Sequence, residues 1–147
     1  MRQPSNYKRL VPKHYPNILL LVFLLFSWPV FATSAASASE TIDESNCNEG
    51  DLQSALNLGG IVEFTTDCTI NLSTQLNIST PVTINNNGHQ VILDGGNNTR
   101  VLNISTSDVV LDGLIIQNGY TTGSGGGINH RGSLTIKNSI LQNNYAG

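Results

Sequence analysis

From residue 61 onward, short apolar segments alternate with polar ones and are separated by Gly or Asn. Within most segments Ile, Val or Leu occupies every second position, which is the period of a β-strand with one buried face. The pattern predicts ten strands, at residues 61–65, 69–73, 76–78, 82–84, 90–93, 100–104, 109–111, 114–117, 133–136 and 140–142. The fold is therefore expected to be all-β with many turns.

One segment ahead of these strands has a helical period. Its apolar residues lie between Leu52 and Leu58, and the preceding residues 48–51 supply an Asn N-cap and an acidic first turn. Gly59 and Gly60 would end the helix. We expect one short helix there, preceded by a polar lead-in at residues 39–46.

An internal repeat decides between β architectures. The segments 111–120 and 136–145 align position by position, with identical Ile, Gln, Asn and Tyr and two further matched apolar positions. Residues 84–93 form a looser third copy upstream of these two. A period of about 25 residues without an internal helix indicates a β-solenoid, in which parallel strands stack coil upon coil. An antiparallel sandwich would explain the short strands but not the repeat.

Two short motifs in the C-terminal part of the sequence resemble those of a known protein family. Gly125-Gly-Gly-Ile128, followed by Ile140-Leu-Gln-Asn143, resembles the paired GG-A-I and F-x-x-N repeats of the polymorphic outer-membrane proteins, with Gly127 in place of Ala and Ile140 in place of Phe. More broadly, residues 47–147 are similar to bacterial secreted right-handed parallel β-helix proteins of the pectate-lyase-like architecture, and residues 47–72 resemble their N-terminal capping region. The resemblance implies a right-handed parallel β-helix of about three to four coils with a short N-terminal capping α-helix.

The first 38 residues have a different composition from the rest. Basic residues precede an apolar run at residues 18–32, which is followed by small residues ending in Ala36-Ser37-Ala38. The run is shorter than the roughly 20 residues that a bilayer span needs, and this order of segments is typical of a secretory signal peptide. An uncleaved signal anchor is the alternative. We predict a signal peptide at 1–38 and a single β-helix domain at 39–147, incomplete at its C-terminus.

The expected location follows from the leader. The protein should be secreted, extracellular or at the cell surface, on the outer membrane in a Gram-negative host, with no membrane span after signal removal. Downstream of the leader, Arg100, Arg131 and Lys137 stand against all ten carboxylates, which gives a formal charge of −7. Such a surface argues against a nucleic-acid partner.

Cys47 and Cys68 are the two cysteines of the chain. In an oxidising compartment two lone cysteines in a small domain usually pair, and the loop closed here would be worth roughly 3 kcal/mol. A metal site is the alternative, but the sequence has no C-x-x-C motif and no His close to either cysteine. We expect a disulfide, no metal site and no cofactor.

Three carboxylates invite a catalytic interpretation. Asp94 and Asp112 both occur in Leu-Asp-Gly, and Asp108 lies nearby in sequence. Two β-helix families would use such groups, as Ca²⁺ ligands in polyuronate lyases or as paired acids in glycosidases. Asp-Gly is however a common turn sequence, and so few basic residues suit a lyase poorly. We therefore assign no catalytic residues, and interpret the Gly-rich segment 119–127 as a bulge between coils rather than a phosphate loop.

Asn recurs beside apolar positions, and in a solenoid equivalent Asn side chains can stack coil upon coil and satisfy backbone groups at corners. The recurring positions are Asn71, Asn77, Asn85, Asn103, Asn118, Asn138 and Asn143. Four asparagines also lie in N-x-S/T sequons, which matter only in a host that glycosylates exported chains: Asn71, Asn77, Asn97 and Asn103. Asn repetition therefore predicts a structural ladder.

Tyr120, His130 and Tyr145 remain as a possible ligand surface, because aromatic rings can stack on sugars. Alternatively they simply cover coil edges. The predicted function is a non-catalytic, exported β-helix module for adhesion or for interaction with carbohydrate or a cell-surface protein. The alternative is a truncated or degenerate carbohydrate-active β-helix enzyme, a polysaccharide lyase or hydrolase. An uncovered last coil would also permit end-to-end self-association.

Overall fold

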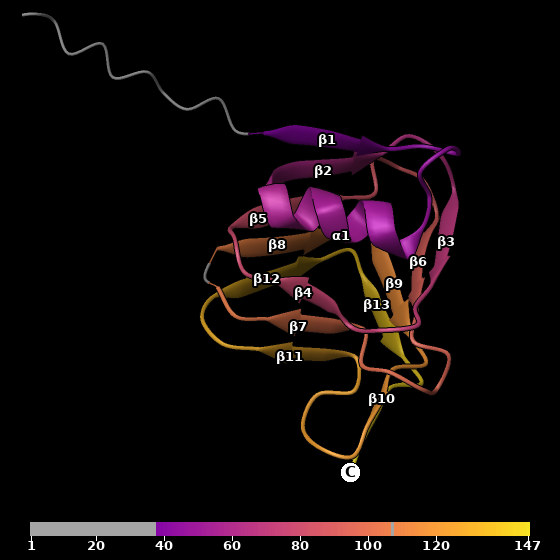
Figure 1. Ribbon diagram of the computed structural model, residues 1–147, viewed down its shortest axis with the longest axis vertical. Coiled ribbons are helices and arrows are strands. Elements are labelled where there is room, and N and C mark those ends of the chain that lie inside the picture. Colours follow the sequence, from indigo (N-terminus) through magenta and orange to yellow (C-terminus); the bar gives the residue numbers. More distant parts are fainter. Residues whose placement is uncertain (1–37, 107) are drawn as a thin grey trace, which may run out of the picture. The chain divides into compact units, whose positions relative to one another are not determined.

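A computed structural model describes residues 38–106 and 108–147, and these form a parallel β-solenoid of about four turns with one short helix (Figure 1). This confirms the solenoid expected from the repeat. The predicted signal peptide lies outside the described residues except for Ala38. Among the residues that are described, no helix has the length and apolar character needed to cross a membrane.

The elements of the solenoid are short and follow one another around the coils. The helix is α1 (Glu49–Leu58). The strands are β1 (Ser39–Ile42), β2 (Gly60–Phe64), β3 (Cys68–Asn71), β4 (Leu76–Ile78), β5 (Val82–Asn85), β6 (Val91–Asp94), β7 (Leu102–Ile104), β8 (Val109–Asp112), β9 (Leu114–Gln117), β10 (Tyr120–Thr121), β11 (Ile128–His130), β12 (Leu134–Lys137), β13 (Ile140–Gln142) and β14 (Tyr145–Ala146).

Strands from successive coils pair in parallel and build four stacks. Their orders are β1-β2-β5-β8-β12, β13-β9-β6-β3, β11-β7-β4 and β10-β14. A complete coil thus contributes one strand to each of the larger stacks. Among the strands of the described residues, β1 and β2 are the one pair of sequence neighbours that bond to each other. The helix between β1 and β2 provides the connection that a parallel pair requires.

The register tests the sequence repeat directly. Leu111 lies opposite Ile136 and Tyr120 opposite Tyr145, so the alignment of the segments 111–120 and 136–145 is confirmed. The looser alignment of residues 84–93 with 111–120 is correct at one end only. Ile84 does lie opposite Leu111, as that copy requires, but Val91 lies opposite Leu114 because the corner between β5 and β6 is longer than the corner between β8 and β9.

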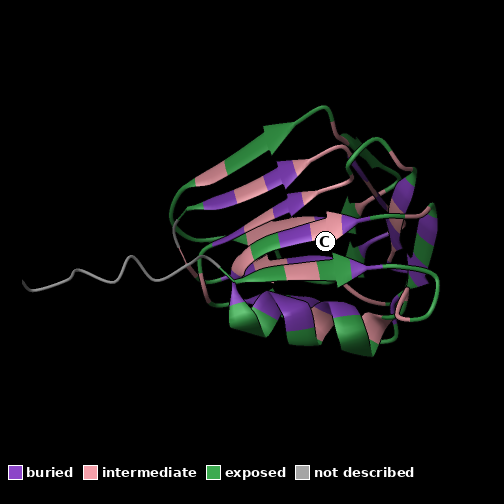
Figure 2. Cartoon of the chain, turned by 90° about the horizontal axis from the view of Figure 1, so that it is seen from above, coloured by how far each residue is buried: buried purple, intermediate pink, exposed green. Residues whose placement is uncertain are grey.

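Apolar side chains fill the interior of the coils. Along the main strands buried positions alternate with half-buried or exposed ones, as Figure 2 shows. Val62, Ile84 and Leu111 form one interior column, and each is at most 1% exposed. No polar side chain is buried among the described residues. The alternation in the sequence therefore reports which side chains face inward.

The helix begins and ends as its flanking residues predict. The Asn48 side chain accepts a hydrogen bond from the backbone N–H of Asp51 at 3.0 Å. Gly59 follows the last helical residue with φ of 74°, and a Cβ there would lie 2.8 Å from the Pro81 carbonyl oxygen. Only glycine fits this combination of a left-handed conformation and a close backbone neighbour.

Side chains of α1 complete the outer edge of β4, against which the helix packs (Figure 1). The Gln53 side chain accepts from the Asn77 backbone N–H at 2.8 Å and donates to the Asn77 carbonyl at 2.9 Å. The Glu49 carboxylate accepts hydrogen bonds from the backbone N–H and hydroxyl groups of both Ser73 and Thr74. The helix is therefore a cap in the physical sense, because it satisfies backbone groups that no strand covers.

The expected position of the cap needs correction. The helix is close to the N-terminus of the domain but does not begin it, because β1 precedes it and pairs in parallel with β2. Residues 39–42 were expected to be a polar lead-in, and they contain a single strongly apolar residue, Ile42, which is 1% exposed. One inward position is too short a pattern to distinguish a strand from a loop.

All ten predicted strands are present, and in the described part of the chain β1 and three other short strands go beyond the prediction. Two of these three, β10 and β14, span two residues each and pair with each other. The third, β11, lies opposite β7. The segment 119–127, which the sequence indicated as a bulge, thus contains a paired strand.

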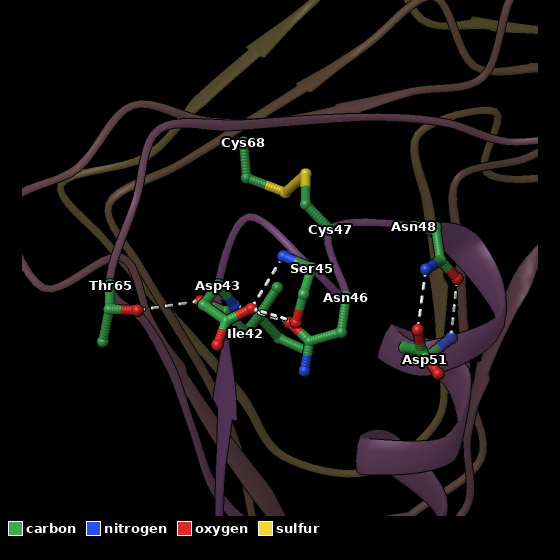
Figure 3. The surroundings of a disulfide bond; sticks show 9 residues. All are labelled: Ile42, Asp43, Ser45, Asn46, Cys47, Asn48, Asp51, Thr65 and Cys68. Carbon is green, nitrogen blue, oxygen red and sulfur yellow. Dashed lines mark hydrogen bonds between the residues drawn. A yellow bond between two sulfur atoms is a disulfide. The ribbon is translucent and has the colours of Figure 1, made fainter.

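The predicted disulfide is confirmed (Figure 3). Cys47 and Cys68 are bonded with their Cα atoms 5.9 Å apart, a usual separation for a disulfide. The bond joins the segment before α1 to the first residue of β3. It therefore fastens the cap to the first full coil.

Candidate functional site

The flank of the solenoid carries a hollow of about 330 Å³ beside β10. It is lined by residues from three successive coils: Gln75, Asn98, Thr99, Arg100, Tyr120, Thr121 and Thr122. All of these side chains can donate or accept hydrogen bonds, and one is aromatic. The hollow is thus a polar recess with a single ring at its border.

That ring is held by a second one. Tyr120 and Tyr145 are directly opposite in the parallel pair β10–β14, and their rings stack with centroids 5.5 Å apart and an angle of 11° between planes. Tyr145 belongs to the following coil and does not line the hollow. The residues that line the hollow come from Tyr120's own coil and the two coils before it. One face of Tyr120 is therefore covered by Tyr145.

Arg100 is the half-buried cation of the hollow. Its guanidinium donates to Gln75 Oε1 at 2.8 Å, to the Gly125 carbonyl at 2.8 Å and to the Ser124 carbonyl at 2.9 Å. These contacts reach the coil before Arg100 and the coil after it, so the side chain is fixed at the border of three coils. All three acceptors are neutral, so these contacts leave the positive charge of Arg100 unneutralised.

This arrangement suits a hydroxyl-rich ligand. An aromatic face packs on the C–H surface of a sugar ring, while amide, hydroxyl and guanidinium groups bond its hydroxyls. A guanidinium has five N–H donors, and the three protein contacts of Arg100 leave two for a ligand.

A second hollow, of about 410 Å³, lies near the disulfide and has a different chemistry. It is lined by Asp43, Glu44, Ser45, Thr65 and Thr66. Figure 3 shows Asp43 turned toward Ser45, which donates both its hydroxyl and its backbone N–H to one carboxylate oxygen. These bonds lower the pKa of Asp43. The Asp43 carboxylate is thus used to close its own turn.

The three carboxylates considered for catalysis do not converge. Asp94 ends β6 and Asp112 ends β8, in different stacks, which agrees with their different phases in the repeat. Burial raises the pKa of Asp94, but hydrogen bonds from the Gly96 backbone, Gln117 and Asn118 outweigh it and lower the pKa overall. Asp112 accepts from Asn138 at 2.8 Å. Both carboxylates therefore accept hydrogen bonds from neighbouring residues at the corners of the solenoid.

The Asp108 carboxylate is also hydrogen-bonded to a neighbouring residue. It has a left-handed backbone with φ of 63° and accepts a hydrogen bond from the Ser133 hydroxyl at 3.2 Å. Within the described ranges, no group of three or more His, Cys, Asp or Glu side chains is placed to hold a metal ion. His89 Nδ1 lies 3.5 Å from the Asp67 carboxylate, and neither residue lines the hollow beside β10.

The three residues of the expected ligand surface are only partly brought together. Tyr120 and Tyr145 stack, but His130 is the exposed last residue of β11, in another stack, and does not line the hollow. The loop between β10 and β11 separates His130 from the tyrosines along the chain.

The expected asparagine ladder is present in one stack. Asn103 donates to Asn77 at 3.1 Å, and Asn129, which the sequence pattern did not single out, donates to Asn103 at 3.0 Å. Asn118 behaves differently from the expectation, because its amide donates to the Asp94 carboxylate at 2.8 Å rather than to a backbone group.

Arg100 and its partners were missed from the sequence as site residues. A signal for them did exist, because Gln75, Arg100 and Gly125 recur at the period of the repeat and so occupy one column of the solenoid. Apolar periodicity does not detect such a column, since all three positions are non-apolar. Comparisons of the chain with models of protein families, with curated proteins and with solved structures find no match.

Proposed function

We propose that this protein is an exported, non-catalytic β-helix module that binds carbohydrate at the hollow beside Tyr120. The observation that carries the proposal is the position of Tyr120, which borders a hollow of about 330 Å³ together with Arg100 and is backed by the stacked ring of Tyr145. A ring fixed from behind loses little conformational entropy when it binds a ligand.

Export is part of the proposal. The sequence pattern of residues 1–38 supports it, and the Cys47–Cys68 disulfide is compatible with an oxidising compartment. When the full chain is expressed in a secreting bacterium, we expect the recovered protein to begin at Ser39. Mass spectrometry of the intact protein measures this, and retention of the apolar run would favour a signal anchor.

Calorimetric titration with a panel of neutral and acidic oligosaccharides tests the binding proposal. Tyr120→Ala should weaken the best ligand roughly tenfold, because loss of an aromatic contact costs about 1–1.5 kcal/mol. Tyr120→Phe keeps the ring and should retain most of the affinity. His130→Ala lies outside the hollow and should change nothing.

Two results would contradict the proposal. Unchanged affinity in Tyr120→Ala would place the ligand elsewhere, and absence of binding across the panel would remove carbohydrate as the partner. The same mixtures, assayed for new reducing ends and for unsaturated products, test the non-catalytic part. Product formation would instead favour a lyase or hydrolase.

A further inference from the structure

The corner between β5 and β6 is closed by a tight turn. The backbone N–H of His89 donates to the Asn86 carbonyl at 2.9 Å, and the two residues between them, Asn87 and Gly88, have φ of 50° and 85°. Positive φ at both central positions is the pattern of a type I′ turn, for which Asn-Gly is a preferred pair. The shape of this corner therefore depends on the Asn-Gly sequence.

Three consecutive asparagines, Asn85, Asn86 and Asn87, lie in this corner, and their side chains have different partners. The Asn85 side chain accepts from the Asn87 backbone N–H at 2.8 Å. The Asn86 side chain donates to the His89 carbonyl at 2.7 Å and accepts from the Gly88 backbone N–H at 3.3 Å. Among the described residues, the side-chain amide of Asn87 has no hydrogen-bond partner, and the residue is exposed.

An asparagine that precedes glycine can lose its side-chain amide to its own backbone. The glycine N–H gives its proton to solvent, and the nitrogen attacks Cγ of the asparagine. The Cγ–Nδ2 bond then breaks, and the side-chain nitrogen takes up a proton from solvent and leaves as ammonia. Water opens the cyclic succinimide at either of its carbonyl groups, which gives aspartate or isoaspartate. Glycine favours the reaction because no Cβ hinders the approach of the two groups.

We propose that Asn87 is a site of spontaneous deamidation in the folded protein. A Cβ built on Gly88 would meet no atom within 4 Å, so nothing crowds the approach of the Asn87 side chain to the Gly88 nitrogen. The bond from the Gly88 N–H to Asn86, at 3.3 Å, is longer than usual and easily opened. With time the corner gains a negative charge or a lengthened main chain. Neither residue lines the hollow beside β10, so this proposal is independent of carbohydrate binding.

The chain has a second Asn-Gly pair, Asn118-Gly119, which the structure holds in the opposite way. The Asn118 side chain donates to the Asp94 carboxylate at 2.8 Å. Gly119 is buried, and its N–H donates to Asn144 Oδ1 at 2.8 Å. A Cβ built on Gly119 would overlap the Gly126 carbonyl oxygen. Deamidation here requires a charge-assisted hydrogen bond to break and packed backbone to move, so the fold protects this pair.

The two Asn-Gly pairs allow the proposal to be tested within one molecule. The exported full chain is incubated in neutral and in mildly alkaline buffer, and digests taken at intervals are analysed by liquid chromatography and mass spectrometry. We expect Asn87 to give both aspartate and isoaspartate, roughly 10- to 100-fold faster than Asn118, because the hydrogen bonds of Asn118 and Gly119 must open first. The rate at Asn87 should rise with pH, since the Gly88 nitrogen attacks after it loses its proton.

A matched pair of variants tests the protection at Asn118. Asn144→Ala removes the acceptor of the Gly119 N–H and should accelerate deamidation at Asn118, with no change at Asn87. Asn144→Asp keeps an acceptor oxygen at this position and should leave Asn118 protected. Both variants lose the bond from the Asn144 amide to the Ile116 carbonyl, so their difference isolates the contact with Gly119.

Unfolding in urea keeps the test independent of misfolded variants. In the unfolded parent chain the two Asn-Gly pairs lose their different surroundings and should deamidate at similar rates. Equal rates at Asn87 and Asn118 in the folded chain would overturn the proposal, because the fold would not distinguish the two pairs. Deamidation of Asn87 in urea but not in buffer would overturn it as well, because the turn would then protect Asn87.

Discussion

At the residue scale, asparagine and aspartate allow the chain to turn. The structure has six non-glycine residues with positive φ among those described, and each is Asn or Asp: Asn87, Asn97, Asp108, Asn118, Asn138 and Asn143. Asn and Asp tolerate the left-handed conformation better than other side chains. The high Asn content therefore reflects corner geometry as much as side-chain ladders.

Glu49 makes a residue-scale prediction about pH. Burial would raise its pKa, but the hydrogen bonds from Thr74 and Ser73 outweigh this and lower the pKa from 4.5 to about 2. A lowered folded-state pKa gives stability that is present above pH 4.5 and is lost as the pH falls toward 2. Glu49→Gln should therefore cost about 1–2 kcal/mol at pH 7, less than full linkage because the carboxylate is partly solvated.

Urea unfolding of both proteins between pH 7 and pH 2 measures this difference. The gap in free energy of unfolding should shrink as the pH falls below 4.5. Glu44→Gln, at an exposed position before the helix, is the control for general charge effects. A gap that does not depend on pH would mean that the Glu49 carboxylate is not bonded as described.

At the element scale, the short pair β10–β14 depends on glycine. Gly126 is buried beside this pair, and a Cβ built on it would overlap the Tyr145 carbonyl oxygen. Its own carbonyl accepts from the Val101 backbone N–H at 3.1 Å, so the residue is held from both sides. Glycine at this position thus lets two coils approach closely.

Gly126→Ala should destabilise the protein by about 1–3 kcal/mol, because a methyl group must displace the backbone of β14. Gly123→Ala is the matched control, since the nearest atom to its Cβ would be Thr121 Oγ1 at 3.9 Å. Thermal unfolding followed by near-ultraviolet circular dichroism reports both stability and the tyrosine pair. Equal stability of the two variants would contradict the close approach at Gly126.

At the scale of the whole molecule, the first and last described coils of the solenoid differ in how they are covered. The N-terminal end is covered by α1 and fastened by the Cys47–Cys68 disulfide. Among the described residues, the inward side chains of β12 and β13, Ile136 and Leu141, are 41% and 47% exposed. Solenoids transmit stability only between neighbouring coils, so we expect the strands that α1 and the disulfide fasten to be more strongly protected than β12 and β13.

Loss of the disulfide should lower the free energy of unfolding by roughly 3 kcal/mol, since its loop constrains the unfolded chain. Cys47→Ser with Cys68→Ser, compared with the parent protein in urea, measures this. In the double variant, hydrogen exchange should show a loss of protection that is largest around α1 and β3 and smaller at β8 and β9. Uniform loss along the solenoid would argue that its coils unfold as one cooperative unit.

The sequence by itself determined the features that periodicity and turn residues encode. Alternation predicted ten of the fourteen strands in the described residues, and Asn48 and Gly59 bounded the helix. The internal repeat predicted the register between the last two coils. These features follow from side-chain periodicity and from turn chemistry, which act over a few residues. The sequence also favoured the disulfide, because the chain has only two cysteines.

The tertiary structure decided what depends on contact between coils. Strands of two residues, such as β10 and β14, form because a partner lies opposite them in the next coil. Arg100 enters the hollow beside Tyr120 because stacking brings Gln75 and Gly125, from the neighbouring coils, within hydrogen-bond distance. The corner between β5 and β6 is longer than its counterpart between β8 and β9, so a constant period cannot place every side chain. Polar residues stacked in one column, such as Gln75 and Arg100, give no apolar periodicity in the sequence. Their contacts are therefore seen only when the coils are stacked in the tertiary structure.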